Sequence, residues 1–453
     1  MVKIKDEIFR AYDIRGIYPT DIDSEFASLA AKAYATFLNG KRIAVSMDVR
    51  TSNKALTVPF IESLINCGAE VWFIGIAPTP LLYFTIAHYG LDGGVAVSAS
   101  HNPPEWNGFK MCGKGAKVLG WGEGLERIKE ILVKRQFTES GNAGALIDKR
   151  QKVLDDYKDF VMEHNKLSRK VKIGIDPGNG ASSEFAVSMF SGMPVEVIAI
   201  NDVPDGRFPS RNPEPKPETI TELRNLVKNK KLDFGVAFDG DGDRAIFVDE
   251  KGEVLGGDTC LALFANNMLK KGETVVYEVS CSDAIEEVVN KKGGKPIVTR
   301  VGHGPIESMM VEKGGALGGE ISGHIYFNTT YYFDDAFFAA AKMAELVSNS
   351  GKKLSQLVDE LPKYERRIKE FDVEDGKKFR AIDILKDNLS KKGFELLTID
   401  GVKARTKDGW FIVRASNTTP KIKMVSGSKD AGRAYELLIL GSKELNYALE
   451  MLK

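Results

Sequence analysis

Three groups of reactive or ligating side chains stand out in this sequence of 453 residues. The first follows the apolar run Val95–Val97 and combines a hydroxyl, an imidazole and an amine at Ser100, His101 and Lys110. Open α/β sheets usually bind ligands just beyond the carboxyl ends of their strands, and this segment places Ser100 there. Ser, Asn and Pro also favour ordinary turns, so the segment alone does not decide between a reactive loop and a plain one.

The second group is an acidic loop between two apolar runs within 232–252. Asp239, Asp241 and Asp243 alternate with glycines, so three carboxylates can converge, and their mutual repulsion calls for a cation. A solvated acidic turn is the plain alternative. An EF-hand is excluded because Arg244 stands where that loop needs glycine and because the flanks are strand-like. Hard oxygen ligands predict Mg²⁺.

The third group consists of polar loops suited to a sugar phosphate. Two loops with glycines, near 301–307 and 318–327, carry four side chains able to contact sugar hydroxyls: His303, Glu320, Ser322 and His324. The segment Arg414–Lys421 offers an arginine, hydroxyls and an amide, which suits a phosphate, and Phe9–Gly16 offers two arginines for an anion. Ordinary turns and solvated charges remain the alternatives for each of these segments taken alone.

Composition narrows the class of protein. The formal net charge of zero gives no support to nucleic-acid binding, and the four scattered cysteines without a CxxC pair suit a reducing cytosol. No signal peptide is visible. The uncharged run Val71–Leu91 is long enough to cross a bilayer, but Gly75, Pro78 and Pro80 predict a strand, a turn and a helix instead. We expect a cytoplasmic protein without membrane or nucleic-acid partners; the sequence does not indicate its oligomeric state.

The elements that must position these groups alternate between strands and helices, a pattern that predicts a mostly parallel sheet covered by helices. The pattern restarts at Lys170–Glu184 and at Glu273–Glu287 and stops near 363–370. We therefore predict three consecutive α/β domains with mixed, mostly parallel sheets, followed by a C-terminal α+β domain around an antiparallel sheet. The predicted bounds are 1–147, 148–252, 253–364 and 365–453.

Some elements are expected at particular residues. Ser24 is expected to cap a helix that reaches Leu38, and a helix is expected after the turn within Lys170–Glu184. Antiparallel strands are expected between residues 394 and 416, followed by an amphipathic helix to Leu452.

Four motifs, SASHNP, DGDGDR, GEISGH and RASNT, stand in this order, one in each predicted domain. Together they resemble the α-D-phosphohexomutase family, and most closely its phosphomannomutase/phosphoglucomutase branch; the resemblance covers essentially the whole chain. It implies that Ser100 carries a phosphoryl group as phosphoserine. It also implies that Asp239, Asp241 and Asp243, together with that phosphate, hold Mg²⁺.

The resemblance implies roles for the other residues as well. His101 and Lys110 are similar to the family's acid/base and phosphate-contacting residues, and Arg244 is similar to the arginine beside its metal loop. The implied substrate contacts are Tyr12, Arg15, His303, Glu320, Ser322 and His324, with Arg414, Ser416, Asn417 and Thr418 at a distal phosphate.

The expected activity is interconversion of hexose 1-phosphate and hexose 6-phosphate, with mannose and/or glucose as the sugar, through phosphoserine and a hexose 1,6-bisphosphate. FRAYDIRG, Ile321 and His303 favour this branch over the phosphoglucosamine mutases, whereas Gly304–Pro305 departs from the expected pattern. A phosphoglucosamine mutase, a metal-dependent serine phosphatase and a binding module without chemistry are the alternatives. Lys110 is expected to shuttle a proton if burial and nearby arginines lower its pKa.

Overall fold

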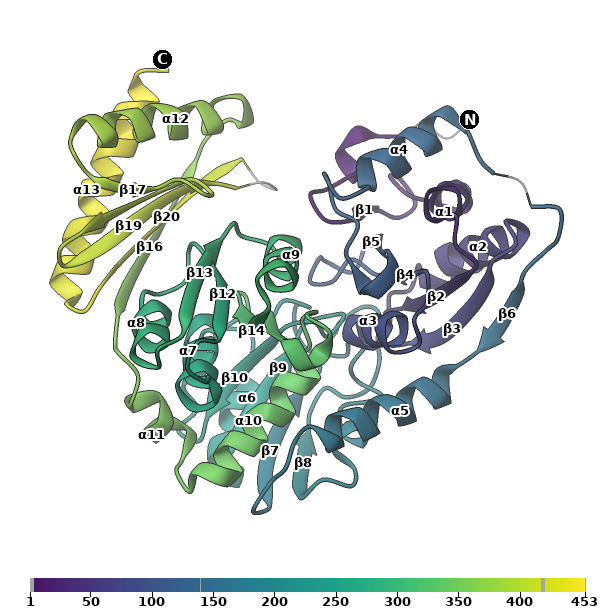
Figure 1. Ribbon diagram of the computed structural model, residues 1–453, viewed down its shortest axis with the longest axis horizontal. Helices are drawn as coiled ribbons and strands as arrows, with labels where there is room; N and C mark the ends of the chain where they lie inside the picture. Colours follow the sequence, from purple (N-terminus) through teal and green to yellow (C-terminus); the bar gives the residue numbers. More distant parts are fainter. Residues whose placement is uncertain (1–3, 139, 417–419, 453) are drawn as a thin grey trace. The chain divides into compact units, whose positions relative to one another are not determined.

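The computed structural model describes residues 4–138, 140–416 and 420–452 (Figure 1). The chain forms two compact units, which are described separately. The first consists of Met1–Gly257 and Ser322–Leu357, and the second of Asp258–Ile321 and Val358–Lys453. The chain therefore passes from one unit to the other three times.

The amino-terminal sheet of the first unit is mixed and mostly parallel, with the strand order β1-β5-β4-β2-β3-β6. Its strands are β1 (Ile14–Ile17), β2 (Arg42–Met47), β3 (Glu70–Ile76), β4 (Gly93–Val97), β5 (Trp106–Cys112) and β6 (Ala145–Asp148). β2 runs parallel to β3 and β4, and β3 to β6, whereas β5 is antiparallel to β1 and β4. β4 is buried along its whole length, as expected of a central strand covered on both faces.

Helices cover this sheet on both faces (Figure 1). They are α1 (Ser24–Leu38), α2 (Asn53–Asn66), α3 (Thr79–His88), α4 (Leu125–Lys134) and α5 (Arg150–Glu163), with the 3₁₀ turns η1 (Asp6–Ile8) and η2 (Lys114–Ala116). α1 packs against α2 and α4, and α3 packs against α5. The uncharged run Val71–Leu91 is divided between β3 and α3, as predicted. Among the described residues, no helix combines the length and the apolarity that a membrane span requires.

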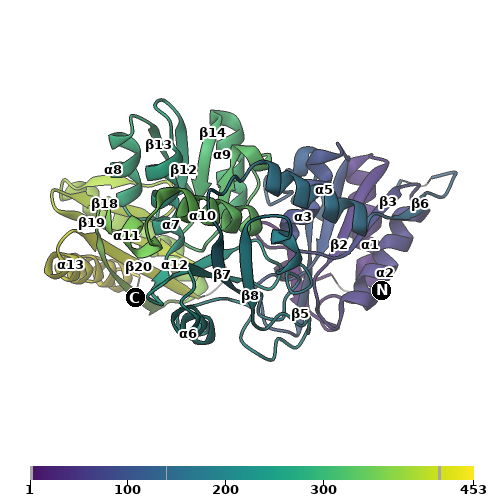
Figure 2. The same ribbon diagram turned by 90° about the horizontal axis from the view of Figure 1, so that it is seen from below.

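The second sheet of the first unit has the order β11-β10-β9-β7-β8. Its strands are β7 (Val171–Asp176), β8 (Val195–Ala199), β9 (Phe234–Phe238), β10 (Ala245–Asp249) and β11 (Val254–Leu255). β7 runs parallel to β8 and β9, and β7 and β8 lie side by side in Figures 1 and 2. α6 (Thr221–Lys230) and α10 (Ala336–Ser350) pack against this sheet. β15 (Ile325–Phe327) and η4 (Asn328–Thr330) precede α10.

Two predicted details of the first unit are wrong. Asp23, not Ser24, is the N-cap of α1, because its carboxylate accepts from the backbone N–H of Phe26 at 2.8 Å. The helix expected after β7 is absent among the described residues there, which form turns and the 3₁₀ turn η3 (Ser188–Phe190). The amides of Asn179 and Ala181 donate to neighbouring loops, at Asn201 and Gly240.

The second unit begins with a parallel arrangement in which β12 (Thr274–Glu278) pairs with β13 (Lys295–Thr299) and β14 (Gly315–Gly319). Its helices are α7 (Gly257–Met268), α8 (Ala284–Lys291) and α9 (His303–Lys313). α11 (Leu354–Asp359) precedes the C-terminal part of the chain. His303, expected in a loop, is instead the first residue of α9; Gly302, with φ +122°, turns the chain into that helix.

The C-terminal sheet is antiparallel, as predicted, with the order β16-β20-β19-β18-β17. Its strands are β16 (Glu365–Asp372), β17 (Glu395–Leu397), β18 (Val402–Thr406), β19 (Gly409–Ala415) and β20 (Lys421–Ser428). α12 (Asp375–Lys391) and α13 (Ala431–Glu450) pack together on one face, against Phe411 and Val413. Trp410 and Ile412 alternate with these residues and pack with Val279 on the other face.

Candidate active site

Ser100 lies just beyond the carboxyl end of β4, and its side chain is buried. Its φ of +49° is unusual for a residue with a side chain and costs of order 1 kcal/mol. Ser98 holds this conformation, since its Oγ accepts from the amide of Ser100 at 2.9 Å and donates to Asp48 Oδ2 at 2.7 Å. The serine hydroxyl is therefore fixed by its neighbours before any ligand arrives.

Arg50, which the sequence analysis missed, holds the rest of this loop. The guanidinium is buried and pairs with Asp48 at 3.0 Å. It donates at 2.5–2.9 Å to four loop carbonyl oxygens, those of Ser100, Asn102, Pro103 and Trp106. The signal in the sequence is an Asp-x-Arg directly after the apolar run of β2, but the contacts join residues about fifty positions apart.

The acidic loop joins β9 to β10, and its three aspartates are buried. One oxygen each of Asp239, Asp241 and Asp243 lies within 4.8 Å of the others. The Ser100 hydroxyl donates to Asp239 Oδ2 at 2.9 Å. Gly240 makes this approach possible, because a Cβ there would lie 2.4 Å from the carbonyl oxygen of Ser100. The structure thus brings the serine loop and the acidic loop together.

Lys110, on β5, meets the aspartates directly. Its Nζ donates to Asp241 Oδ2 at 2.6 Å and to Asp243 Oδ2 at 2.5 Å. Burial alone would lower the pKa of Lys110, but the charges of Asp241 and Asp243 outweigh burial and raise it. Lys110 is therefore an ammonium in this arrangement, the opposite of the lowered pKa considered from the sequence. Burial, together with Asp243 and Asp241, holds the pKa of Asp239 well above its usual range.

The acidic loop fits a divalent cation. Oδ1 of Asp241 and Oδ1 of Asp243 are buried and have no hydrogen-bond partner among the described residues. Unpaired buried carboxylate oxygens are costly unless a cation compensates them. The ammonium of Lys110 supplies one positive charge here, and the remaining hard oxygen ligands suit Mg²⁺.

His101 also contacts the serine hydroxyl, with Nδ1 3.0 Å from Ser100 Oγ. The positive charge of Arg244, burial and the charge of Arg15 hold the pKa of His101 well below its usual range, so the imidazole is neutral. Arg15 also donates to the loop, at Asn102 Oδ1 (2.5 Å) and at the carbonyl of Ala99 (3.1 Å). Tyr12 lies against Gly120, in the first unit.

Arg244 connects the acidic loop to the loop after Ser322. Its Nε donates to His324 Nε2 at 3.0 Å and lies 3.9 Å from Asp239 Oδ2. Nδ1 of His324 contacts Asp334 Oδ2 at 2.5 Å. In the structure His324, for which a sugar contact was predicted, holds Arg244 at the acidic loop. Asp334, a carboxylate that the sequence analysis missed, contacts the other ring nitrogen of His324.

The remaining predicted contacts lie in the second unit. Glu320 is buried just after β14, and His303 begins α9. Arg414, on β19, donates from Nε to Asp400 Oδ2 at 2.8 Å, and the amide of Ser416 donates to the carbonyl of Lys421 at 2.9 Å. The predictions for Asn417 and Thr418 lie outside the described residues.

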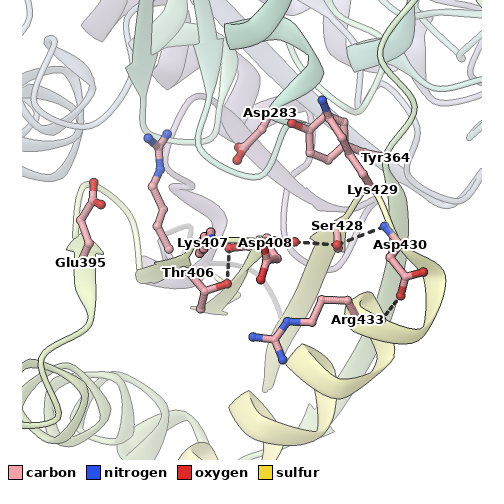
Figure 3. A pocket seen from close by; sticks show the side chains of 12 residues that line it. Asp283, Tyr364, Glu395, Thr406, Lys407, Asp408, Ser428, Lys429, Asp430 and Arg433 are labelled. Carbon is pink, nitrogen blue, oxygen red and sulfur yellow. Dashed lines mark hydrogen bonds between the residues drawn. The ribbon is translucent and has the colours of Figure 1, made fainter.

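The second unit also contains a pocket of about 840 Å³ between α8 and the C-terminal sheet (Figure 3). None of the described residues predicted for the site lines it. Three of its four lining cations, Arg405, Lys429 and Arg433, are each paired with a glutamate at 2.7–2.8 Å; the fourth is Lys407. Because most of this positive charge is already compensated, the pocket is not assigned to the chemistry.

A buried serine hydroxyl held against three converging carboxylates, on a scaffold of mixed α/β sheets, is the arrangement of an enzyme of metal-assisted phosphoryl transfer. Comparison with protein-family models agrees with this class. Four models of phosphoglucomutase/phosphomannomutase domains match successive segments of the chain. They are alpha/beta/alpha domain I at residues 6–138, domain II at 154–252, domain III at 256–364 and the C-terminal domain at 369–438.

Individual relatives agree with the family models. The chain is 37% identical to a phosphomannomutase of Methanocaldococcus jannaschii, with 92% of each chain covered. It is 33% identical to a phosphoglucomutase/phosphomannomutase of Thermococcus kodakarensis, covering 98% of this chain and 99% of that protein. A crystal structure of a family protein from Burkholderia thailandensis superimposes with a TM-score of 0.90 at 29% identity, covering 99% and 98% of the two chains. The chain belongs to the phosphoglucomutase/phosphomannomutase family.

Proposed function

We propose that this protein is a phosphohexomutase, an isomerase that interconverts hexose 1-phosphate and hexose 6-phosphate with mannose and/or glucose as the sugar. The family and the names of its relatives support this activity over that of a phosphoglucosamine mutase or a serine phosphatase. The observation that carries the proposal is the position of Ser100 Oγ, 2.9 Å from Asp239 and 3.0 Å from His101.

The proposed cofactor is Mg²⁺, held by Asp239, Asp241, Asp243 and the phosphate of phosphoserine at Ser100. When bound, the cation neutralises charge on the transferring phosphoryl oxygens. The three carboxylates and their unpaired oxygens are the features of the chain that support this assignment.

Phosphoryl transfer breaks the bond between Ser100 Oγ and phosphorus and forms one between phosphorus and a sugar hydroxyl oxygen. The hydroxyl proton must leave the sugar, and Ser100 Oγ must gain a proton. His101 is neutral and lies 3.0 Å from Ser100 Oγ, so it can take up the proton of the sugar hydroxyl and pass it to Ser100 Oγ. Lys110 keeps its proton beside Asp241 and Asp243 and can contact the phosphoryl oxygens as an ammonium. Arg244 adds a fixed positive charge beside Asp239.

The product of this transfer is a hexose 1,6-bisphosphate. This intermediate reorients in the site and transfers its other phosphate to Ser100. Both orientations present a phosphate away from the serine. We assign that distal phosphate to Arg414, Ser416, Asn417 and Thr418. The proposed contacts to the rest of the substrate are Tyr12, Arg15, His303, Glu320, Ser322 and His324. The division into four domains with the bounds given above, and a cytoplasmic location, belong to the same proposal.

The test is ³¹P NMR of the purified protein with Mg²⁺ and a trace of hexose 1,6-bisphosphate, given mannose 1-phosphate, glucose 1-phosphate or glucosamine 1-phosphate in separate samples. Conversion to the 6-phosphate, fastest for mannose or glucose, is expected. Release of inorganic phosphate in place of the 6-phosphate contradicts the mutase and favours a phosphatase. Fastest conversion of glucosamine 1-phosphate contradicts the assigned branch.

A further inference from the structure

Glu278 is a buried carboxylate that the mechanism above does not use. It is the last residue of β12, and its side chain is fully buried. Oε2 accepts from the backbone N–H of Ser280 at 2.6 Å. Oε1 is buried and has no hydrogen-bond partner among the described residues. A buried carboxylate with only one oxygen hydrogen-bonded lowers the stability of the fold. Its presence therefore suggests a role other than stability.

Asp258 is a carboxylate with a purely structural role, and it serves as a comparison. It binds Ser282, in the same loop after β12 as Ser280. It accepts from the amide of Ser282 at 3.0 Å, and its charge is paired with Arg366 at 2.6 Å. Glu278 makes the equivalent backbone contact without an ion pair of that kind among the described residues.

The surroundings of Glu278 come from the two loops assigned to the substrate. β12 and β14 are parallel, and Tyr277 is in register with Gly319. Glu278, the last residue of β12, and Glu320, the residue after β14, therefore lie at the carboxyl ends of adjacent strands, at the same edge of the sheet. Burial raises the pKa of Glu278; the amide and hydroxyl of Ser280, the charge of Arg414 and the amide of Ile321 oppose that rise. The amide of Ile321, in the loop that follows β14, and the charge of Arg414, on β19, thus both act on this carboxylate.

We propose that Glu278 is a positioning residue for hexose phosphate binding: it orients the backbone at Glu320 and Ile321, in the loop after β14 to which we assign sugar contacts. This inference rests on the proposed function, because that function supplies the ligand. Since the side chain is fully buried, Glu278 acts through this loop and not by touching the sugar.

The test compares the wild type with Glu278→Ala and Glu278→Gln by calorimetric binding of glucose 6-phosphate and by mutase kinetics. Glu278→Ala removes the acceptor for Ser280 and is expected to weaken binding at least tenfold and to raise KM. Glu278→Gln keeps an acceptor oxygen and is expected to recover part of the binding. Mg²⁺ affinity is expected to stay within twofold of the wild type in both variants, because the three aspartates lie in the other unit.

The matched control is Glu444→Gln. Glu444 is another buried glutamate of the second unit, where it pairs with Lys392 and accepts from Asn388 at 2.5 Å. Its substitution is expected to lower the melting temperature without changing glucose 6-phosphate affinity. If the folded Glu278 variants match the wild type in affinity and KM and lose only stability, as the control does, the proposal is overturned.

Failure of the proposed function gives a different result. A wild-type protein that binds glucose 6-phosphate but does not isomerise any hexose phosphate contradicts the mutase, while the binding arm still decides the role of Glu278. If Glu278→Ala does not fold, the isosteric Glu278→Gln carries the same comparison, with unchanged affinity and KM overturning the proposal.

Discussion

Arg244 donates from Nε to Nε2 of His324 at 3.0 Å, so this ring nitrogen is the acceptor and carries no proton. The proton of the neutral ring is then on Nδ1, which contacts Asp334. Arg244 in turn lies 3.9 Å from Asp239, the carboxylate that accepts from Ser100. The tautomer of His324 therefore helps to hold the positive charge of Arg244 near Asp239, the carboxylate that contacts Ser100.

Replacing Asp334 with alanine is expected to lower kcat roughly 10- to 100-fold, because a hydrogen bond to a charged group contributes about 1.5–3 kcal/mol. Without the carboxylate, His324 can rotate or change tautomer and release Arg244. The measurement is steady-state kinetics together with Mg²⁺ affinity, which is expected to change little. Glu218→Gln, at an exposed position, is the control. Wild-type kcat in Asp334→Ala contradicts the role assigned to the tautomer.

Ser100→Ala is expected to abolish mutase activity, because no other described hydroxyl donates to Asp239 Oδ2. Intact-mass measurement after incubation with hexose 1,6-bisphosphate is expected to show one added phosphoryl group on the wild type and none on the variant. Ser24→Ala, at the exposed start of α1, serves as the control and should take up phosphate normally. Uptake of phosphate by Ser100→Ala would falsify the assignment of the nucleophile.

The local parts of the site were predictable from the sequence, and its long-range supports were not. Asp239, Asp241 and Asp243 lie in one turn between two apolar runs, so their convergence follows from five residues. Arg50, by contrast, meets the carbonyl of Ser100 only after β2 and β4 pair. No local pattern reports such a contact.

A missing local pattern also accounts for two of the strands that were not predicted. β6 and β16 are edge strands with largely exposed side chains, so they lack the alternation of buried and exposed residues that identifies a strand. β20 does alternate, with Ile422 and Met424 buried and Lys423 exposed, and could have been recognised from that pattern. Glu278 gave no signal, because a glutamate after an apolar run is typical of many strand ends.

Mg²⁺ is expected to raise the melting temperature of the wild type. A ligand that binds only the folded state adds about 2.7 kcal/mol at a concentration one hundred times Kd. Asp241→Asn removes one of the three carboxylates and leaves Lys110 with fewer charges to meet, so its melting temperature should respond much less to Mg²⁺. Differential scanning calorimetry in MgCl₂ and in NaCl of equal ionic strength separates binding from screening. Equal shifts in the two salts argue against a specific cation site.

Asp335 makes the stability of the first unit depend on pH. It caps α10, accepting from the amide of Phe338 at 2.9 Å and from the hydroxyl of Tyr157 at 2.7 Å. Burial raises the pKa of Asp335 to about 7. The folded state therefore binds this proton more tightly than the unfolded state, whose carboxyl has a pKa of roughly 4. Its contribution to stability is complete below about pH 4 and is lost as pH rises to about 7.

Asp335→Asn keeps an oxygen acceptor for the cap and for Tyr157 but has no charge to bury. Its stability relative to the wild type is expected to increase between pH 4 and pH 7, by at most about 4 kcal/mol, and to level off above pH 7. Urea midpoints of both proteins at half-unit intervals from pH 4.5 to pH 8 measure this difference. Curves that run parallel over the whole range would show that Asp335 is already ionised in the folded protein at pH 4.5, because the Phe338 amide and the Tyr157 hydroxyl then outweigh burial.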